Sequence, residues 1–255
     1  MTEFGWCAGI GRAEQVKEHG YDYMECPLSP LMKEGPEAVK KALPKYANLA
    51  IPVKAWNSFF PRDMKLVGPE ADERRIRNYV AQAVDTMSRA GSSIAVLGSG
   101  RSRHVPEGWE RERAEDQLVR LLSLIADECE GTGLTVAIEP LNRKESNIIN
   151  SVAEGAALAK AVHRPQIRVL ADFYHMDEEQ EALETIAEHK EWLAHIHVAD
   201  TGRCSPGTGQ YPYDEFVKQL RAAGYQGGVS VECTVHDWDS ELPAALSFLK
   251  KKWGA

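Results

Sequence analysis

Four short apolar runs in the second half of the chain each end on a side chain that can bind a metal ion or transfer a proton. The runs LTVAI, IRVLA, LAHI and GVSV are followed by Glu139, Asp172, His197 and Glu232. A carboxylate at the end of an apolar run is costly to bury alone and cheap beside a cation. Because carboxylates and imidazoles are ligands for divalent metal ions, these residues predict a metal site if the fold brings them together.

The types of these four ligands indicate which ion and which chemistry to expect. Three carboxylates and one imidazole favour Mn²⁺, with Mg²⁺ or Co²⁺ as alternatives, over structural zinc, which prefers sulfur and nitrogen. Octahedral coordination leaves two positions for the adjacent oxygens of a hydroxycarbonyl substrate. Removing a proton beside the carbonyl gives an enediolate, which requires a base on one face and an acid on the other. The proton can return to either carbon, and the sequence does not decide which.

Strand-like runs alternate with helical patterns along all 255 residues. The expected strands are 3–7, 22–26, 53–56, 93–97, 134–139, 167–172, 193–197 and 228–232. Eight βα units in about 250 residues predict a single-domain (β/α)₈ TIM barrel over residues 1–255, with its active site at the C-terminal ends of the strands. An open doubly wound sheet is disfavoured, because CAGIGRAEQ after the first strand lacks the third glycine of a dinucleotide-binding turn.

Several helix starts and stops are marked in the sequence. Residues 111–131 repeat leucine and isoleucine at three- and four-residue steps, and Gly131 supplies a stop. Two pairs fit capping boxes and two prolines fit a first helical turn. These start signals are Ser151 with Glu154, Asp177 with Gln180, Pro36, and Pro69.

Four segments together resemble the sugar isomerase and epimerase barrels related to xylose isomerase. The segments are EPLNRKESNIIN, DFYH, HIHVADTGR and SVEC, and they are most similar to the D-tagatose 3-epimerase and D-psicose 3-epimerase group. The resemblance implies a metal-dependent epimerase or isomerase of a small ketose, with Glu139 and Glu232 as opposed acid/base residues and as metal ligands beside Asp172 and His197. It further implies substrate contacts from Glu145, His175 and Arg203. The family tends to be dimeric or tetrameric, which implies a homo-oligomer.

Three other functions are weighed against this one. A hydroxypyruvate isomerase, or another aldose–ketose isomerase, resembles the site in its paired glutamates. An apurinic endonuclease of the same barrel type requires further histidines on earlier strands, whereas the third and fourth strands end in AWN and LGSG. A non-catalytic sugar-binding protein has no need for opposed carboxylates around a cation. Which sugar is used, and whether it is phosphorylated, stays open.

The composition restricts partners and location. A formal net charge of −8 disfavours nucleic acid and anionic membranes. The five cysteines are scattered without a C-x-x-C pair, as is typical of a reducing compartment. No signal peptide or membrane span is evident, so we expect a cytoplasmic protein whose partner is a small sugar.

Three weaker signals come from two single residues and one short segment. His195 lies two residues before His197 on the same strand face, and we expect a hydrogen-bonded structural histidine. Glu25 could reach the pocket or be a solvated loop carboxylate. The segment GSGRSRHVPEG, residues 98–108, contains two arginines, but it lacks the ending of a phosphate-binding P-loop and is predicted to be a flexible loop at the barrel mouth.

Overall fold

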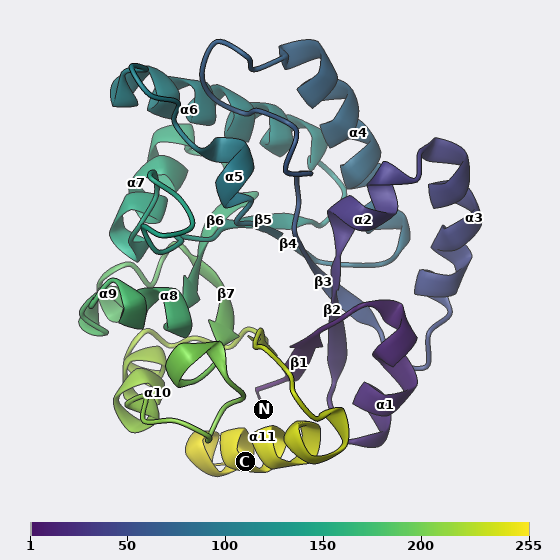
Figure 1. The fold of residues 1–255 in the computed structure, drawn as a ribbon, viewed down its shortest axis with the longest axis vertical. Helices are drawn as coiled ribbons and strands as arrows, with labels where there is room; N and C mark the ends of the chain where they lie inside the picture. The colour runs from purple at the N-terminus through teal and green to yellow at the C-terminus, as the bar shows by residue number, and fades with distance from the viewer. Residues whose placement is uncertain (1, 255) are drawn as a thin grey trace.

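Within residues 2–254, which are those that the structure describes, eight parallel strands form a closed barrel (Figure 1). The structure is a computed structural model. Each strand pairs with its neighbours in the chain, and β1 also pairs with β8. The strands are β1 Phe4–Cys7, β2 Tyr23–Pro27, β3 Val53–Asn57, β4 Ile94–Leu97, β5 Thr135–Ile138, β6 Ile167–Asp172, β7 Leu193–Val198 and β8 Val229–Val231. The predicted TIM barrel is therefore confirmed, and no predicted strand end is more than one residue from the observed one.

Helices surround the barrel and fill the connections between strands (Figure 1). They are α1 Ala13–Glu18, α2 Leu28–Lys33, α3 Pro36–Ala47, α4 Glu73–Arg89, α5 Gly100–Arg103, α6 Arg111–Glu128, α7 Val152–Val162, α8 Phe173–Glu178, α9 Glu184–Glu188, α10 Tyr213–Ala222 and α11 Trp238–Trp253, with short 3₁₀ turns η1 Ile10–Arg12 and η2 Thr201–Arg203. Among the described helices, none has the length and apolar content needed to cross a bilayer.

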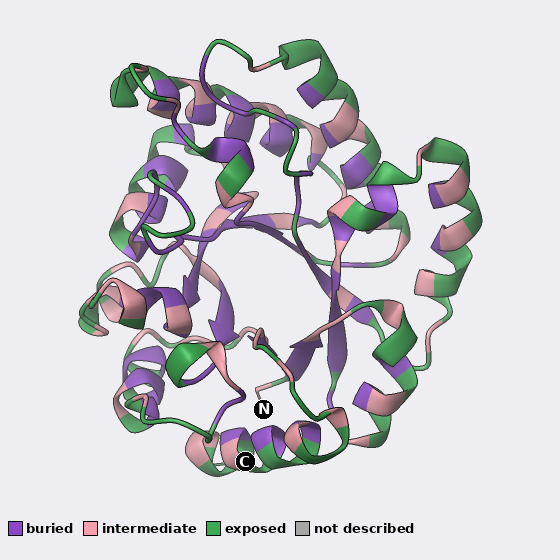
Figure 2. Cartoon of the chain, viewed as in Figure 1, coloured by how far each residue is buried: buried purple, intermediate pink, exposed green. Residues whose placement is uncertain are grey.

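Buried residues are concentrated in the strands and on the helix faces that meet them (Figure 2). In α6 the predicted leucine and isoleucine positions are buried, which places that helix face against the barrel. A separate small cluster joins Val96, Ala137 and Leu170 from three successive strands. Because side chains alternate along a strand, Glu139 and Asp172 lie on the same face as Ala137 and Leu170, one step closer to the C-terminal mouth.

Two of the four helix-start predictions are confirmed. The Ser151 hydroxyl caps α7 by accepting from the Glu154 N–H at 3.1 Å. Pro36 lies in the first turn of α3, where its missing N–H costs nothing.

The other two helix-start predictions are wrong. Asp177 lies inside α8, because that helix already begins at Phe173, where the preceding Asp172 caps it. Pro69 precedes α4 by several residues, since Asp72 accepts from the Arg75 N–H at 2.9 Å and sets the start at Glu73. In both cases a side-chain cap at another position fixes the helix start.

Candidate active site

The four predicted ligand residues converge at the mouth of the barrel. Each of Glu139, Asp172, His197 and Glu232 offers one ligand atom, and these atoms lie within 4.8 Å of one another. The His197 Nδ1 atom is 3.1 Å from Glu139 Oε1 and 3.3 Å from Glu232 Oε2. It is 3.7 Å from Asp172 Oδ2. Side chains from β6 and β7 and from just beyond β5 and β8 thus share one small volume.

The two oxygens of Asp172 have different surroundings. Oδ1 accepts from the backbone N–H groups of Tyr174 and His175, at 2.8 and 3.2 Å, and so caps α8. Oδ2 is buried and has no hydrogen-bond partner among residues 2–254. A buried carboxylate oxygen without a partner is costly. Asp172 is therefore held rigidly by one oxygen, while the other is free to bind a cation.

The donor set fits a divalent cation. The cluster combines three carboxylates with one imidazole, and Asp172 Oδ2, a buried oxygen without a hydrogen-bond partner among residues 2–254, lies 3.7 Å from His197 Nδ1. The carboxylates of Glu139 and Asp172 are buried and that of Glu232 is half-buried, and all three repel one another unless positive charge lies between them. Glu139, Asp172, His197 and Glu232 are the residues that would hold the ion.

The pKa shifts reflect the same need for positive charge. Burial raises the pKa of Glu139, and the negative charge of Glu232 raises it further. Burial disfavours the charged form of His197, but the carboxylates of Glu25 and Glu232 outweigh burial and raise the pKa of His197 well above its ordinary value. Burial also disfavours ionised Glu232, but the charges of His197 and Arg203 are stronger and lower its pKa.

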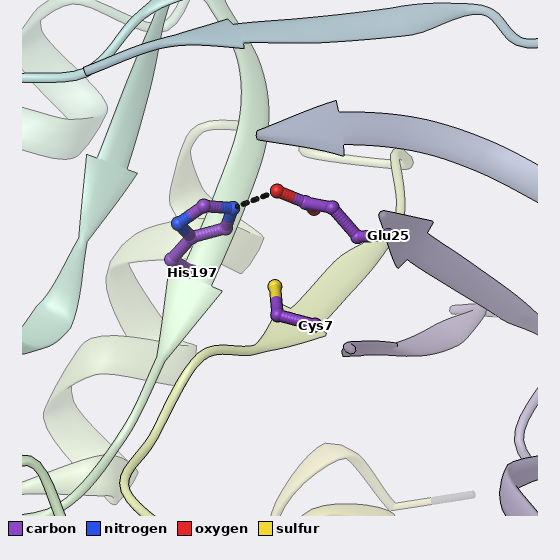
Figure 3. A group of neighbouring side chains, drawn as sticks. All are labelled: Cys7, Glu25 and His197. Atoms are coloured by element: carbon purple, nitrogen blue, oxygen red, sulfur yellow. Dashed lines mark hydrogen bonds and ion pairs between the residues drawn. The ribbon is translucent and has the colours of Figure 1, made fainter. Parts of the chain in front are cut away.

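A fully buried carboxylate lies behind His197 (Figure 3). The two oxygens of Glu25, on β2, lie 2.9 Å from His197 Nε2 and 2.8 Å from His195 Nε2. Glu25 is a strong acceptor, because the charge of His197 outweighs burial and lowers the pKa of Glu25 far below its ordinary value. In the neutral imidazole, with its one proton on Nε2 and donated to Glu25, the Nδ1 lone pair of His197 would face the carboxylates of Glu139, Asp172 and Glu232.

The structure excludes one of the two alternatives that the sequence left open for Glu25. It is 0% exposed, so it is not a solvated loop carboxylate. Its position near the end of the second strand, like that of Glu139 or Asp172, is the signal that could have placed it in the site. The hydrogen bond expected for His195 is present, because that residue is buried and bonded to Glu25, which also bonds His197. The Cys7 sulfur lies in the same group of neighbours as Glu25 and His197 (Figure 3).

A cavity of about 520 Å³ opens beside the cluster, within the range of about 300–1,000 Å³ that is usual for small-molecule sites. Its lining includes Glu139 and Glu232 together with the three predicted substrate-side residues, Glu145, His175 and Arg203. All seven residues predicted to form the site are therefore close to one cavity: five line it, and Asp172 and His197 lie behind them in the cluster.

Arg203 and His175 each offer hydrogen-bond donors at this cavity. Arg203 donates to Glu232 Oε2 at 2.7 Å and to Glu145 Oε1 at 3.2 Å, and it thereby links the two carboxylates. His175 Nδ1 accepts from the Asn142 N–H at 3.2 Å, so its proton is on Nε2. Within the described chain, that buried Nε2 has no hydrogen-bond partner.

The segment 98–108 lies at the barrel mouth as predicted, but the prediction of a loop is wrong for residues 100–103. Residues 100–103 form α5, and Arg103 is fully buried. Its guanidinium donates to the carbonyl oxygens of Leu97 at 3.0 Å, Glu139 at 2.8 Å and Ile149 at 3.4 Å. Burial lowers the pKa of Arg103 to about 10. An arginine in a glycine- and serine-rich segment gave no sign of this burial in the sequence.

A closed parallel barrel with carboxylate and histidine side chains gathered at its C-terminal mouth defines the class of TIM-barrel enzymes. Within that class, the chain belongs to the xylose isomerase-like TIM barrel family, which matches residues 13–252. This family is the one that the sequence motifs resemble, so that prediction is confirmed.

Several of the similar proteins are epimerases. The chain is 28% identical over 236 residues to 3-dehydro-D-guloside 4-epimerase of Escherichia coli (strain K12), covering 85% of this chain and 84% of that protein. It is 25% identical over 225 residues to the ketose 3-epimerase of Arthrobacter globiformis, covering 86% and 75%. The structure of a D-psicose 3-epimerase, solved in the presence of D-fructose, superposes with a TM-score of 0.87 at 20% identity over 100% of both chains. The chain is accordingly an enzyme of the isomerase class.

Proposed function

We propose that the protein is a divalent-metal-dependent epimerase of a small ketose, of the ketose 3-epimerase type. The observation that carries this proposal is the pair of Glu139 and Glu232. They lie directly after β5 and β8, and both line one cavity. Both carboxylates approach His197 Nδ1, at 3.1 and 3.3 Å. Two acids at one ligand cluster can address the two faces of a sugar carbon.

Glu139, Asp172, His197 and Glu232 would hold the metal ion, and Mn²⁺ suits them best, with Mg²⁺ and Co²⁺ as alternatives. The ion supplies Lewis acidity toward negative charge on the substrate oxygens. One of the two glutamates removes the proton from the carbon beside the carbonyl, which leaves an enediolate. The other returns a proton to the same carbon from the opposite face, and that carbon is inverted.

The other lining residues position the substrate. Arg203 is fixed between Glu232 and Glu145, so it can donate to a sugar oxygen without losing its orientation. The His175 Nε2–H is a buried donor that a substrate hydroxyl or carbonyl oxygen would satisfy. Glu145 is 41% exposed at the rim, where it can accept from a hydroxyl group. These three residues hold the sugar while the glutamates move the proton.

Exchange with solvent tests the reaction. The Mn²⁺-loaded protein is incubated with a panel of ketoses in D₂O, and NMR locates the deuterium. We expect deuterium at C3 in both the substrate and its epimer. Deuterium in an aldose product would indicate aldose–ketose isomerisation instead, and no incorporation from any sugar would refute the proposal. Glu139→Gln and Glu232→Gln proteins serve as inactive controls.

We also propose that the protein acts as a homo-oligomer, a dimer or tetramer, in the cytoplasm. The family resemblance supports the homo-oligomer. The five free cysteines support the cytoplasmic location, because unpaired thiols are usual in a reducing compartment. Light scattering on the purified protein measures the oligomeric state.

A further inference from the structure

The reaction cavity has two chemically different walls. The lining residues from Glu139 onward in the sequence include three acidic side chains, those of Glu139, Glu145 and Glu232. Those that precede Glu139, contributed by the end of β3 and by the segments that follow β2, β3 and β4, include no aspartate or glutamate in the described chain. They carry the arginines Arg62 and Arg101 and the serines Ser29, Ser58, Ser99 and Ser102.

Hydrogen bonds join the two segments that carry these arginines, the loop with Arg62 and helix α5 with Arg101. The Phe60 N–H donates to Ser99 Oγ at 3.0 Å, and Ser102 Oγ donates to the Pro61 carbonyl at 3.0 Å. These contacts join the residues next to Arg62 to those on either side of Arg101. Arg103 is buried just beyond them. The two arginines thus arise from one rigid unit.

The charges of Arg62 and Arg101 are not neutralised within the described chain. Neither side chain forms an ion pair or a hydrogen bond with residues 2–254, and both residues are exposed. The two other cations that line the cavity are paired, Arg203 with Glu145 and Glu232, and Lys144 with Glu178. In a chain with a net charge of −8, two free arginines on one wall leave a local site for an anion.

We propose that Arg62 and Arg101 bind an anionic group, a phosphate ester or a carboxylate, at the end of the substrate that is remote from Glu139 and Glu232. This inference rests on the proposed function and narrows its substrate to an acidic sugar. The guanidinium fork binds phosphate and carboxylate oxygens in pairs, and the serine hydroxyls can donate to the remaining oxygens. A wall with cations and no acid favours an anionic sugar over its neutral counterpart.

Kinetics on three matched substrates test the inference. The Mn²⁺-loaded protein is given a free ketohexose, its terminal phosphate ester and the keto acid with a terminal carboxylate, and kcat/KM is measured by epimer formation. We expect at least one anionic sugar to exceed the free ketose by about tenfold or more, as for hydrogen bonds to a charged group. The better of the two anions identifies the source of the charge.

Arginine variants show whether these side chains are responsible. In Arg62→Gln and Arg101→Gln, the ratio of kcat/KM for the anionic sugar to that for the free ketose should fall by about tenfold. Arg74→Gln, an exposed arginine on α4 that does not line the cavity, is the matched control and should keep the wild-type ratio. A preference for the free ketose, or a ratio that both variants retain, would overturn the inference.

A binding measurement separates this inference from the proposed function. If no sugar of any kind is turned over, the proposed function fails, and calorimetric titration with inorganic phosphate then tests the anion site alone. Phosphate binding that is lost in the Arg62→Gln/Arg101→Gln double variant and retained in Arg74→Gln supports the anion site. Absence of binding to the wild-type protein, or equal binding to the double variant, refutes it.

Discussion

Replacing Glu25 with glutamine should weaken metal binding without disturbing the barrel. Both oxygens of Glu25 serve as acceptors, for His195 Nε2 at 2.8 Å and for His197 Nε2 at 2.9 Å. Glutamine has nearly the same shape but offers only one oxygen, and its amide group is a donor. One of the two histidines must then carry its proton on Nδ1. If His197 does so, a proton replaces the lone pair that faces the carboxylates.

The size of this effect follows from the hydrogen bond that Glu25 accepts from His197, a proposed metal ligand. Loss of such a partner typically weakens metal affinity by about 10–100-fold, which corresponds to about 1.4–2.7 kcal/mol. The upper part of the range is expected here, because Glu25 is fully buried and water cannot replace the missing acceptor.

The assay is a Mn²⁺ titration followed by electron paramagnetic resonance of the free ion. Circular dichroism and the thermal midpoint check that the variant is folded. Glu181→Gln is the control, because Glu181 is half-buried and, like Glu25, accepts a hydrogen bond, from the Val152 N–H, but it lies at the start of α7 and not in the cluster. Mn²⁺ affinity within twofold of wild type in a folded Glu25→Gln protein would refute the reasoning.

Three further predictions concern the cluster and its support. Glu139→Gln and Glu232→Gln should each lower kcat by about 10²–10⁴-fold with an unchanged circular dichroism spectrum, and near-wild-type turnover of either would contradict the acid/base pair. His197→Ala should lower the Mn²⁺ content after dialysis, measured by atomic emission, and unchanged occupancy would remove it from the ligand set. Arg103→Met removes two short charge-assisted hydrogen bonds, which are worth about 1.5–3 kcal/mol each. Part of this loss is offset, because the variant no longer has to desolvate a buried cation. It should therefore lower the free energy of unfolding in urea by about 3 kcal/mol, and an unchanged midpoint would show that Arg103 is dispensable.

Much of the fold could be predicted because its signals are local. Strand-forming apolar runs at regular spacing mark the eight strands, and each is long enough to be recognised without knowing its partner. Helix starts were less predictable, as Pro69 and Asp177 show, because several residues near each start can cap a helix. The competition is decided by which side chain reaches the free N–H groups, and Asp172 does so for α8.

The positions of Glu139, Asp172, His197 and Glu232 could also be read from the sequence, because the ends of parallel strands meet at one face of a closed barrel. Their types and order therefore determined a candidate ligand set. The surroundings of that set depend on contacts that close only in three dimensions. Glu25 lies on β2 and His197 on β7, strands that are not paired with each other, so their contact across the barrel interior leaves no local pattern.

Arg103 shows the same division between local and tertiary information. It follows a run of glycine, serine and arginine, which is typical of an exposed loop, yet the backbone carbonyls of Leu97, Glu139 and Ile149 surround its guanidinium. The sequence by itself determined the strands, their order and the residues at their ends. Only the tertiary structure decided which charges are buried and what satisfies them, because burial is a property of the closed barrel and not of any single segment.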